Sequence, residues 1–139
     1  MIEGVAGVVL WTDNVARLAA FYSDVLGLTT HSVRPEFVAF SFGNVRLSIG
    51  KHSQVSGEAK DPYRVMVNLA VGDIHEEYAR FMEKGVFFLR PPEREGWGGW
   101  VATFNDLDGN ILQLLQQPQD EPSSDRGLLP LGTTCPNTR

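Results

Sequence analysis

Residues 14–28 read NVARLAAFYSDVLGL, and residues 73–85 read DIHEEYARFMEKG. Each stretch opens with a residue type that caps helix N-termini, Asn14 or Asp73, and closes near a glycine, where helices commonly end. Between these ends the apolar residues recur at helical spacing, so each stretch predicts one amphipathic helix. The two stretches lie about 60 residues apart, and this repetition predicts an internal duplication.

Short apolar or alternating runs flank both helices and predict strands. They cover residues 5–11, 28–33, 36–42 and 45–50 in the first half, and 63–71, 86–90, 98–105 and 110–117 in the second. Gly43-Asn44 and Asp108-Gly109-Asn110 are hairpin-turn sequences, and Lys51–Asp61 and Pro91–Gly96 are predicted to be connections. The chain therefore has the order strand–helix–strand–strand–strand twice, which is an α+β fold.

The composition is that of a soluble globular protein. The chain has 139 residues, 42% of them hydrophobic and 21% charged, with a net charge of −5. We predict one domain over residues 1–117, made of modules at 4–50 and 63–117, followed by a flexible, polar tail at 118–139. No run approaches a membrane span, no secretory signal is visible, and no basic cluster suits nucleic acid. The single cysteine, Cys135, excludes an internal disulfide and favours the cytoplasm.

Strand alternation predicts a second sheet face turned away from the helices. Trp97 and Trp100 are placed near that face by their glycine-rich segment, and the other candidates by alternation. The candidate ligand-binding residues are Trp11, Phe37, Arg46, Ser48, Arg64, Met66, Asn68, Trp97, Trp100 and Gln113. The alternative is that these side chains only fill the interior of a small barrel and that the tryptophans pack in a core or interface. Arginines and amides fill an interior poorly unless they are hydrogen-bonded.

Three motifs carry a resemblance to a known family. Asn14-(x)6-Phe21-Tyr22-(x)3-Leu26-Gly27-Leu28 resembles the opening of the vicinal oxygen chelate superfamily, the glyoxalase, bleomycin-resistance and ring-cleaving dioxygenase group. Asp106-Leu107-Asp108-Gly109-Asn110 resembles its closing D-P-D-G-N signature, with leucine in place of proline. Trp97-Gly98-Gly99-Trp100 is similar to a segment of the bleomycin-resistance branch. The resemblance spans residues 4–117 and implies paired βαβββ modules, an eight-stranded cup-like sheet with two helices outside, and commonly a homodimer.

The resemblance also implies where a divalent metal would be held. Carried over by position, the four ligand places are Gly7, Ser48, Met66 and Gln113. Glycine offers no side chain, a thioether and a neutral hydroxyl suit a hard cation poorly, and one amide cannot hold the ion alone. His31, His52 and His75 show no ligand spacing. We therefore expect neither a metal nor another cofactor.

Other chemistries are disfavoured by position. Asp106 and Asp108 lie in a turn, where carboxylates usually bind local backbone amides rather than act as acid and base. Glu93, Arg94 and Glu95 are expected to form a solvated loop, and no helix follows the glycines at 96, 98 and 99 as a phosphate loop requires.

Three functions remain open. The first is a metal-free protein that sequesters a small organic molecule in a concave groove, with drug resistance as one role; the acidic balance favours a cationic ligand, whereas Arg46 and Arg64 favour a carboxylate or phosphate. The second is a lyase, isomerase or dioxygenase with non-standard metal ligands. The third is a regulatory or accessory module that only dimerises or binds a partner across its sheet edge. A metal-free enzyme that stabilises an anion with Arg46 or Arg64 has no feature of its own in its favour.

Overall fold

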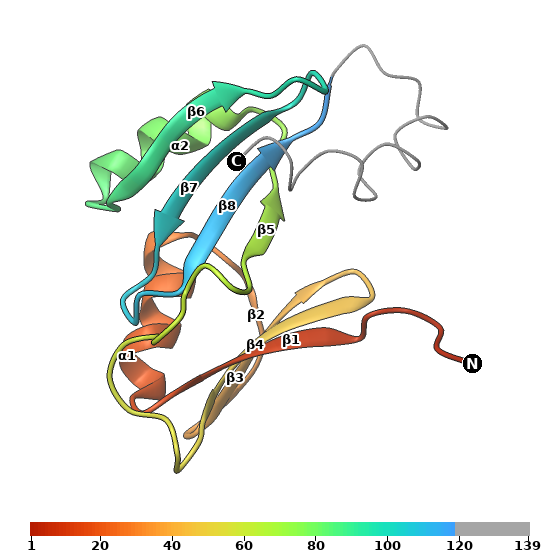
Figure 1. The fold of residues 1–139 in the computed structure, drawn as a ribbon. Coiled ribbons are helices and arrows are strands. Elements are labelled where there is room, and N and C mark those ends of the chain that lie inside the picture. Colours follow the sequence, from red (N-terminus) through yellow and green to blue (C-terminus); the bar gives the residue numbers. More distant parts are fainter. Residues whose placement is uncertain (119–139) are drawn as a thin grey trace. The chain divides into compact units, whose positions relative to one another are not determined.

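The computed structural model describes residues 1–118 (Figure 1). Along the chain it contains β1 (Gly7–Thr12), α1 (Val15–Ala20), the π-helix η1 (Phe21–Val25), β2 (Thr30–Arg34), β3 (Phe37–Phe42), β4 (Val45–Lys51), β5 (Val67–Ala70), α2 (Ile74–Glu83), β6 (Phe88–Arg94), β7 (Trp100–Asn105) and β8 (Ile111–Gln116). The predicted α+β fold of paired βαβββ modules is confirmed. None of the helices in the described part is long and apolar enough to cross a membrane. Except for Pro118, the predicted tail and its Cys135 lie outside the described residues.

The chain divides into two compact units. The first comprises residues 1–61 and the turn 106–110, and the second comprises residues 62–105 and the chain from Ile111 onward. Each unit holds one four-stranded sheet, in the order β1-β4-β3-β2 or β5-β8-β7-β6. In both sheets the first pair is parallel and the other two pairs are antiparallel. The eight predicted strands therefore form two sheets of the same topology.

In the first unit, α1 begins at the predicted cap. The Asn14 side chain accepts a hydrogen bond from the Arg17 amide at 3.1 Å. The predicted single helix changes to a π-helix at Phe21, whose carbonyl accepts from the amide of Leu26, five residues later. Apolar residues from the helices and from β3 and β4 form the core of this unit, with Leu18, Tyr22, Phe40 and Ile49 fully buried.

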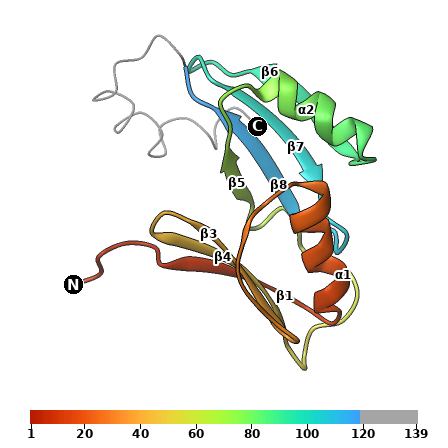
Figure 2. The same ribbon diagram turned by 180° about the vertical axis from the view of Figure 1, so that it is seen from behind.

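In the second unit, α2 also begins at its predicted cap, where Asp73 accepts from the Glu76 amide at 3.1 Å. The helix lies along one face of its sheet (Figure 2). The rings of Phe81 and Phe104 meet edge to face, 5.6 Å apart. The fully buried residues on this side of the sheet include Ile74, Ala102, Phe104, Leu112 and Leu114.

Two predicted boundaries in the second unit are wrong. The strand predicted at 63–71 begins only at Val67, because the parallel ladder of β5 starts opposite Leu112, close to the beginning of β8. The predicted connection Pro91–Gly96 instead continues β6 as far as Arg94. Because β6 is an edge strand, one of its two sides has no neighbouring strand, and the prolines need no N–H group there. On the side that pairs with β7, register shifts interrupt the ladder around the prolines.

Candidate functional site

Four predicted site residues share one face of the first unit's sheet. Strand pairing aligns Trp11 with Gly50 and Gly50 with Phe37, so the three residues form a row across β1, β4 and β3. Ser48 lies two residues before Gly50 on the same face, and Arg46 lies two residues before Ser48. The opposite face carries the buried Leu47 and Ile49. The structure thus brings together the first-half candidates that alternation predicted.

Three aromatic side chains form a partly exposed surface on this face, which we call the aromatic platform: Trp11, Phe37 and His52. The Trp11 ring lies 6.3 Å from Phe37 and 5.4 Å from His52, and 43% of Trp11 is exposed. Gly50 lies beneath the first two rings. A Cβ there would come within 2.7 Å of Trp11 Cζ3 and 2.8 Å of Phe37 Cδ1. The glycine therefore lets both rings lie over the strand.

Gly7, the first of the metal-ligand places implied by the resemblance, has no room for a side chain. A Cβ at this position would lie 2.6 Å from the carbonyl oxygen of Arg46 and 3.3 Å from its Cβ. The Arg46 backbone is itself held by a 3.0 Å hydrogen bond from its amide to the Ala6 carbonyl. A ligand residue at position 7 would therefore require β1 and β4 to separate.

The four implied ligand places form two equivalent pairs, Gly7 with Ser48 in the first unit and Met66 with Gln113 in the second. Gly7 lies two residues before Val9, which pairs with Ser48. Met66 likewise lies two residues before Asn68, which pairs with Gln113. Ser48 and Gln113 are both buried, but one is a neutral hydroxyl and the other an amide. This donor set does not fit a divalent metal, because it contains neither a carboxylate nor an imidazole.

The second unit has a polar row on the sheet face that Asn68 and Gln113 share. Register aligns Asn68 with Gln113, Gln113 with Thr103, and Thr103 with Arg90, across all four strands. The Gln113 amide nitrogen donates to Thr103 Oγ1 at 3.1 Å. Thr103 and Arg90 were missed in the sequence, although the alternation of WVATFN at 100–105 could have indicated Thr103.

Arg90 is held by two carboxylates. Its Nε donates to Glu93 at 2.8 Å, and its Nη2 donates to Glu95, whose side chain is only 2% exposed. Burial lowers the pKa of the Arg90 guanidinium, but the hydrogen bonds to both glutamates outweigh burial and raise that pKa above its ordinary value. Arg90 Nη1 is buried with no hydrogen-bond partner among the described residues. The prediction that Glu95 is solvated is wrong.

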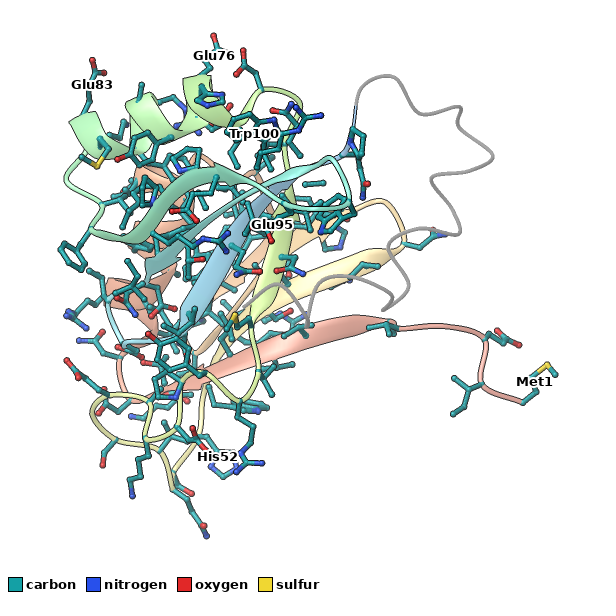
Figure 3. The ribbon with its side chains drawn as sticks, turned by 45° about the horizontal axis from the view of Figure 1, so that its top comes forward. Met1, His52, Glu76, Glu83, Glu95 and Trp100 are labelled. Carbon is teal, nitrogen blue, oxygen red and sulfur yellow. The ribbon has the colours of Figure 1, made fainter. Side chains whose placement is uncertain are left out.

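The two tryptophans of the second unit, Trp97 and Trp100, lie apart from this polar row. Trp100, labelled in Figure 3 beside α2, pairs with Gln116 on the opposite face. Its ring meets that of His75 in α2 edge to face at 4.7 Å. Trp97 lies over Gly99, where a Cβ would come within 2.1 Å of its ring. Arg64 and Met66 precede β5, so strand alternation does not orient them. The structure therefore does not bring Trp100 onto the face of Gln113.

The turn 106–110 confirms the local role predicted for the Asp106 carboxylate, whereas the same prediction for Asp108 is wrong. Asp106 Oδ1 accepts from the amides of Asp108 and Asn110 at 2.9 and 3.0 Å. Three longer-range bonds were not predicted. Tyr22 donates to Asp106 at 2.6 Å, and Asp108 accepts from Thr12 at 2.6 Å and from Arg17 Nη1 at 3.2 Å. Burial raises the pKa of Asp106 despite these donors, and burial with the nearby Asp106 carboxylate raises that of Tyr22 well above 10.0.

Histidines and carboxylates do not form a replacement metal site in the described units. Within residues 1–118, no three side chains of His, Cys, Asp or Glu gather as a metal site would require. His31, His52 and His75 are all exposed. His52 and His75 instead contact tryptophan rings.

Comparison with known proteins identifies the family. Residues 4–114 match the model of the Glyoxalase/Bleomycin resistance protein/Dioxygenase superfamily, and the chain belongs to this superfamily. An uncharacterized protein of Shewanella frigidimarina (strain NCIMB 400) is 39% identical over 59 residues, which are 42% of this chain and 43% of that protein, so the match spans less than half of this relative.

Two further comparisons cover most of the chain. The metallothiol transferase FosB of Staphylococcus epidermidis is 25% identical over 116 residues, covering 82% of this chain and 84% of that protein. The crystal structure of a glyoxalase/bleomycin resistance protein/dioxygenase from Nocardioides superposes with a TM-score of 0.71 at 20% identity, covering 87% of both chains. This structural likeness establishes the fold.

Proposed function

We propose that the protein binds and sequesters a small organic molecule without a metal, on the sheet faces turned away from the helices. The observation that carries the proposal is the 2.6 Å approach that a Cβ at Gly7 would make to the Arg46 carbonyl. The first implied ligand place lacks a side chain and also lacks the space for one. Because Ser48, Met66 and Gln113 are weak donors for a hard cation, the chain cannot build the family's metal site from these positions.

The aromatic platform supports binding of a planar molecule. An exposed tryptophan beside a phenylalanine offers a flat apolar surface, and stacking contributes about 0.5–1.5 kcal/mol per aromatic contact beyond the area buried. Arg46 lies further along the same face, and Ser48 lies between them. A ligand with an aromatic part and a polar or anionic part matches this arrangement. Drug resistance by sequestration is one role that such binding would serve.

The metallothiol transferase relative supports the competing function, a metal-dependent enzyme with ligands outside the inherited positions. Metal content separates the two functions. Protein purified without chelator is analysed for Mn, Fe, Co, Ni, Cu and Zn. We expect less than about a tenth of an equivalent per chain, whereas about one equivalent of any of these metals would contradict the proposal.

Binding at the aromatic platform is tested with two probes of opposite charge, bleomycin and 1-anilinonaphthalene-8-sulfonate. We expect at least one probe to quench tryptophan fluorescence saturably and the Trp11→Ala variant to bind it about tenfold more weakly, a loss of about 1.4 kcal/mol. Phe42→Ala is the matched control, because Phe42 is an exposed aromatic residue of β3 on the other face. Saturable binding that Trp11→Ala leaves unchanged, or no binding of either probe, would refute a ligand surface at Trp11.

A further inference from the structure

A second row of side chains crosses the sheet of the second unit, on the face that carries α2. Register aligns Arg94 with Trp100 and Trp100 with Gln116, across β6, β7 and β8. This is the end row of the sheet, beside the start of α2. The Ile74 amide donates to Gln116 Oε1 at 2.7 Å, and the His75 ring lies 4.7 Å from that of Trp100.

An open cavity of about 400 Å³ lies at this place, entirely within the second unit. Its main lining side chains are Asp73, His75, Arg94, Trp100, Gln116 and Gln117. The volume is at the lower end of the range for small-molecule sites, about 300–1,000 Å³. The cavity is therefore large enough for a molecule of a few functional groups.

The lining includes one cationic and one acceptor side chain that have no partner among residues 1–118. Arg94 is exposed, and its guanidinium has no hydrogen bond or ion pair with any residue in 1–118. The side-chain oxygen of Gln117 is buried and has no donor among the described residues. A guanidinium selects carboxylates through paired hydrogen bonds, and an amide oxygen requires a donor. Trp100 and His75 add flat ring surfaces beside these groups.

The N-terminus of α2 does not explain this site. The Ile74 and Glu76 amides already donate to Gln116 and Asp73, so they are not available to a ligand. The Asp73 carboxylate also repels an anion that comes close to the helix start. The anionic end of a ligand is therefore expected at Arg94, away from Asp73, and its donor at Gln117.

We propose that this cavity is a binding site for a small planar carboxylate that also carries a hydrogen-bond donor. The site is independent of the aromatic platform, because it uses other residues on the α2-bearing face of the other sheet. Salicylate has the required chemistry and serves as the probe, and salicylamide is its neutral counterpart. The readout is the set of indole N–H signals of the three tryptophans in ¹H–¹⁵N spectra, with the Trp100 signal assigned from Trp100→Phe.

We expect salicylate to shift the Trp100 signal saturably, with a dissociation constant below about 10 mM. Arg94→Gln and the replacement of salicylate by salicylamide should each weaken binding about tenfold, which corresponds to about 1.4 kcal/mol. Arg34→Gln, which removes an exposed arginine of the first unit, is the matched control and should leave the constant within about twofold.

Three results would overturn the site. The first is a Trp100 signal that salicylate leaves unmoved up to about 20 mM, twice the upper limit expected for the dissociation constant. The second is equally strong binding of salicylate to Arg94→Gln, and the third is a shift of the Trp11 signal alone. The last result would place carboxylate binding at the aromatic platform and would support the proposed function while refuting this cavity.

Discussion

The strongest prediction concerns Gly7→Ala. The added methyl group would lie 2.6 Å from the Arg46 carbonyl, and real Cβ contacts are longer than 3.0 Å. The carbonyl cannot move alone, because the amide of the same residue is bonded to Ala6. Forcing one methyl group into a closely packed contact costs about 1–3 kcal/mol. The φ angle of Gly7 is not positive, so the smaller entropy of the unfolded chain offsets about 0.4–1 kcal/mol of this cost.

The net expectation is a loss of about 1–2 kcal/mol in the free energy of unfolding, or a Tm lower by about 3–10 °C. The assay is urea and thermal unfolding followed by circular dichroism. Gly72→Ala is the matched control, since a Cβ there meets nothing within 4 Å and its φ is not positive; it should be neutral or slightly stabilising. If Gly7→Ala were as stable as Gly72→Ala, position 7 would accept a side chain, and the steric argument against the metal site would fail.

Three further predictions test the buried hydrogen bond between Tyr22 and Asp106 and the aromatic platform. Tyr22→Phe leaves Asp106 without its 2.6 Å donor and should cost about 1–3 kcal/mol in urea unfolding, whereas a loss below about 0.5 kcal/mol would contradict the bond. The pKa of Asp106 is raised above 3.8 in the folded state. The stability that this group contributes is therefore fully present below pH 3.8 and is lost as the pH rises through the higher folded pKa. Relative to Asp106→Asn, the native chain should thus lose stability as the pH rises from below 3.8 through the folded pKa, and a stability difference that does not change with pH would exclude the shift. Gly50→Ala would bring a Cβ within 2.8 Å of both Trp11 and Phe37 and should abolish the nuclear Overhauser contacts between their rings; unchanged contacts would show that Gly50 is not needed beneath them.

Local signals in the sequence were sufficient to predict the order of the helices and strands. Asn14 and Asp73 cap the two helices because each side chain accepts from an amide three residues later, a purely local bond. Gly43 adopts a positive φ of 61° in the turn between β3 and β4, as its place beside Asn44 predicts. Such features depend on a few neighbouring residues, so a single sequence records them.

Features that depend on register could not be predicted in the same way. The bulges between Phe88 and Glu93 change which face each later residue of β6 occupies. As a result Arg90 joins the row of Thr103, whereas Arg94 joins that of Trp100 on the opposite face. The bond from Tyr22 to Asp106 joins residues 84 positions apart, and nothing local in either segment indicates it.

The metal question shows how residue identity and available space differ as evidence. In the sequence, Gly7 is only a position that lacks a ligand side chain, and the single substitution Gly7→His would supply one. In the structure, the carbonyl of Arg46 occupies the place where a side chain would begin. Ser48 and Gln113 present no such obstacle, because both positions already hold buried side chains. Regaining a metal would therefore require the first parallel pair of strands to move apart as well as new donors to appear, which makes position 7 the decisive place for the proposed metal-free function.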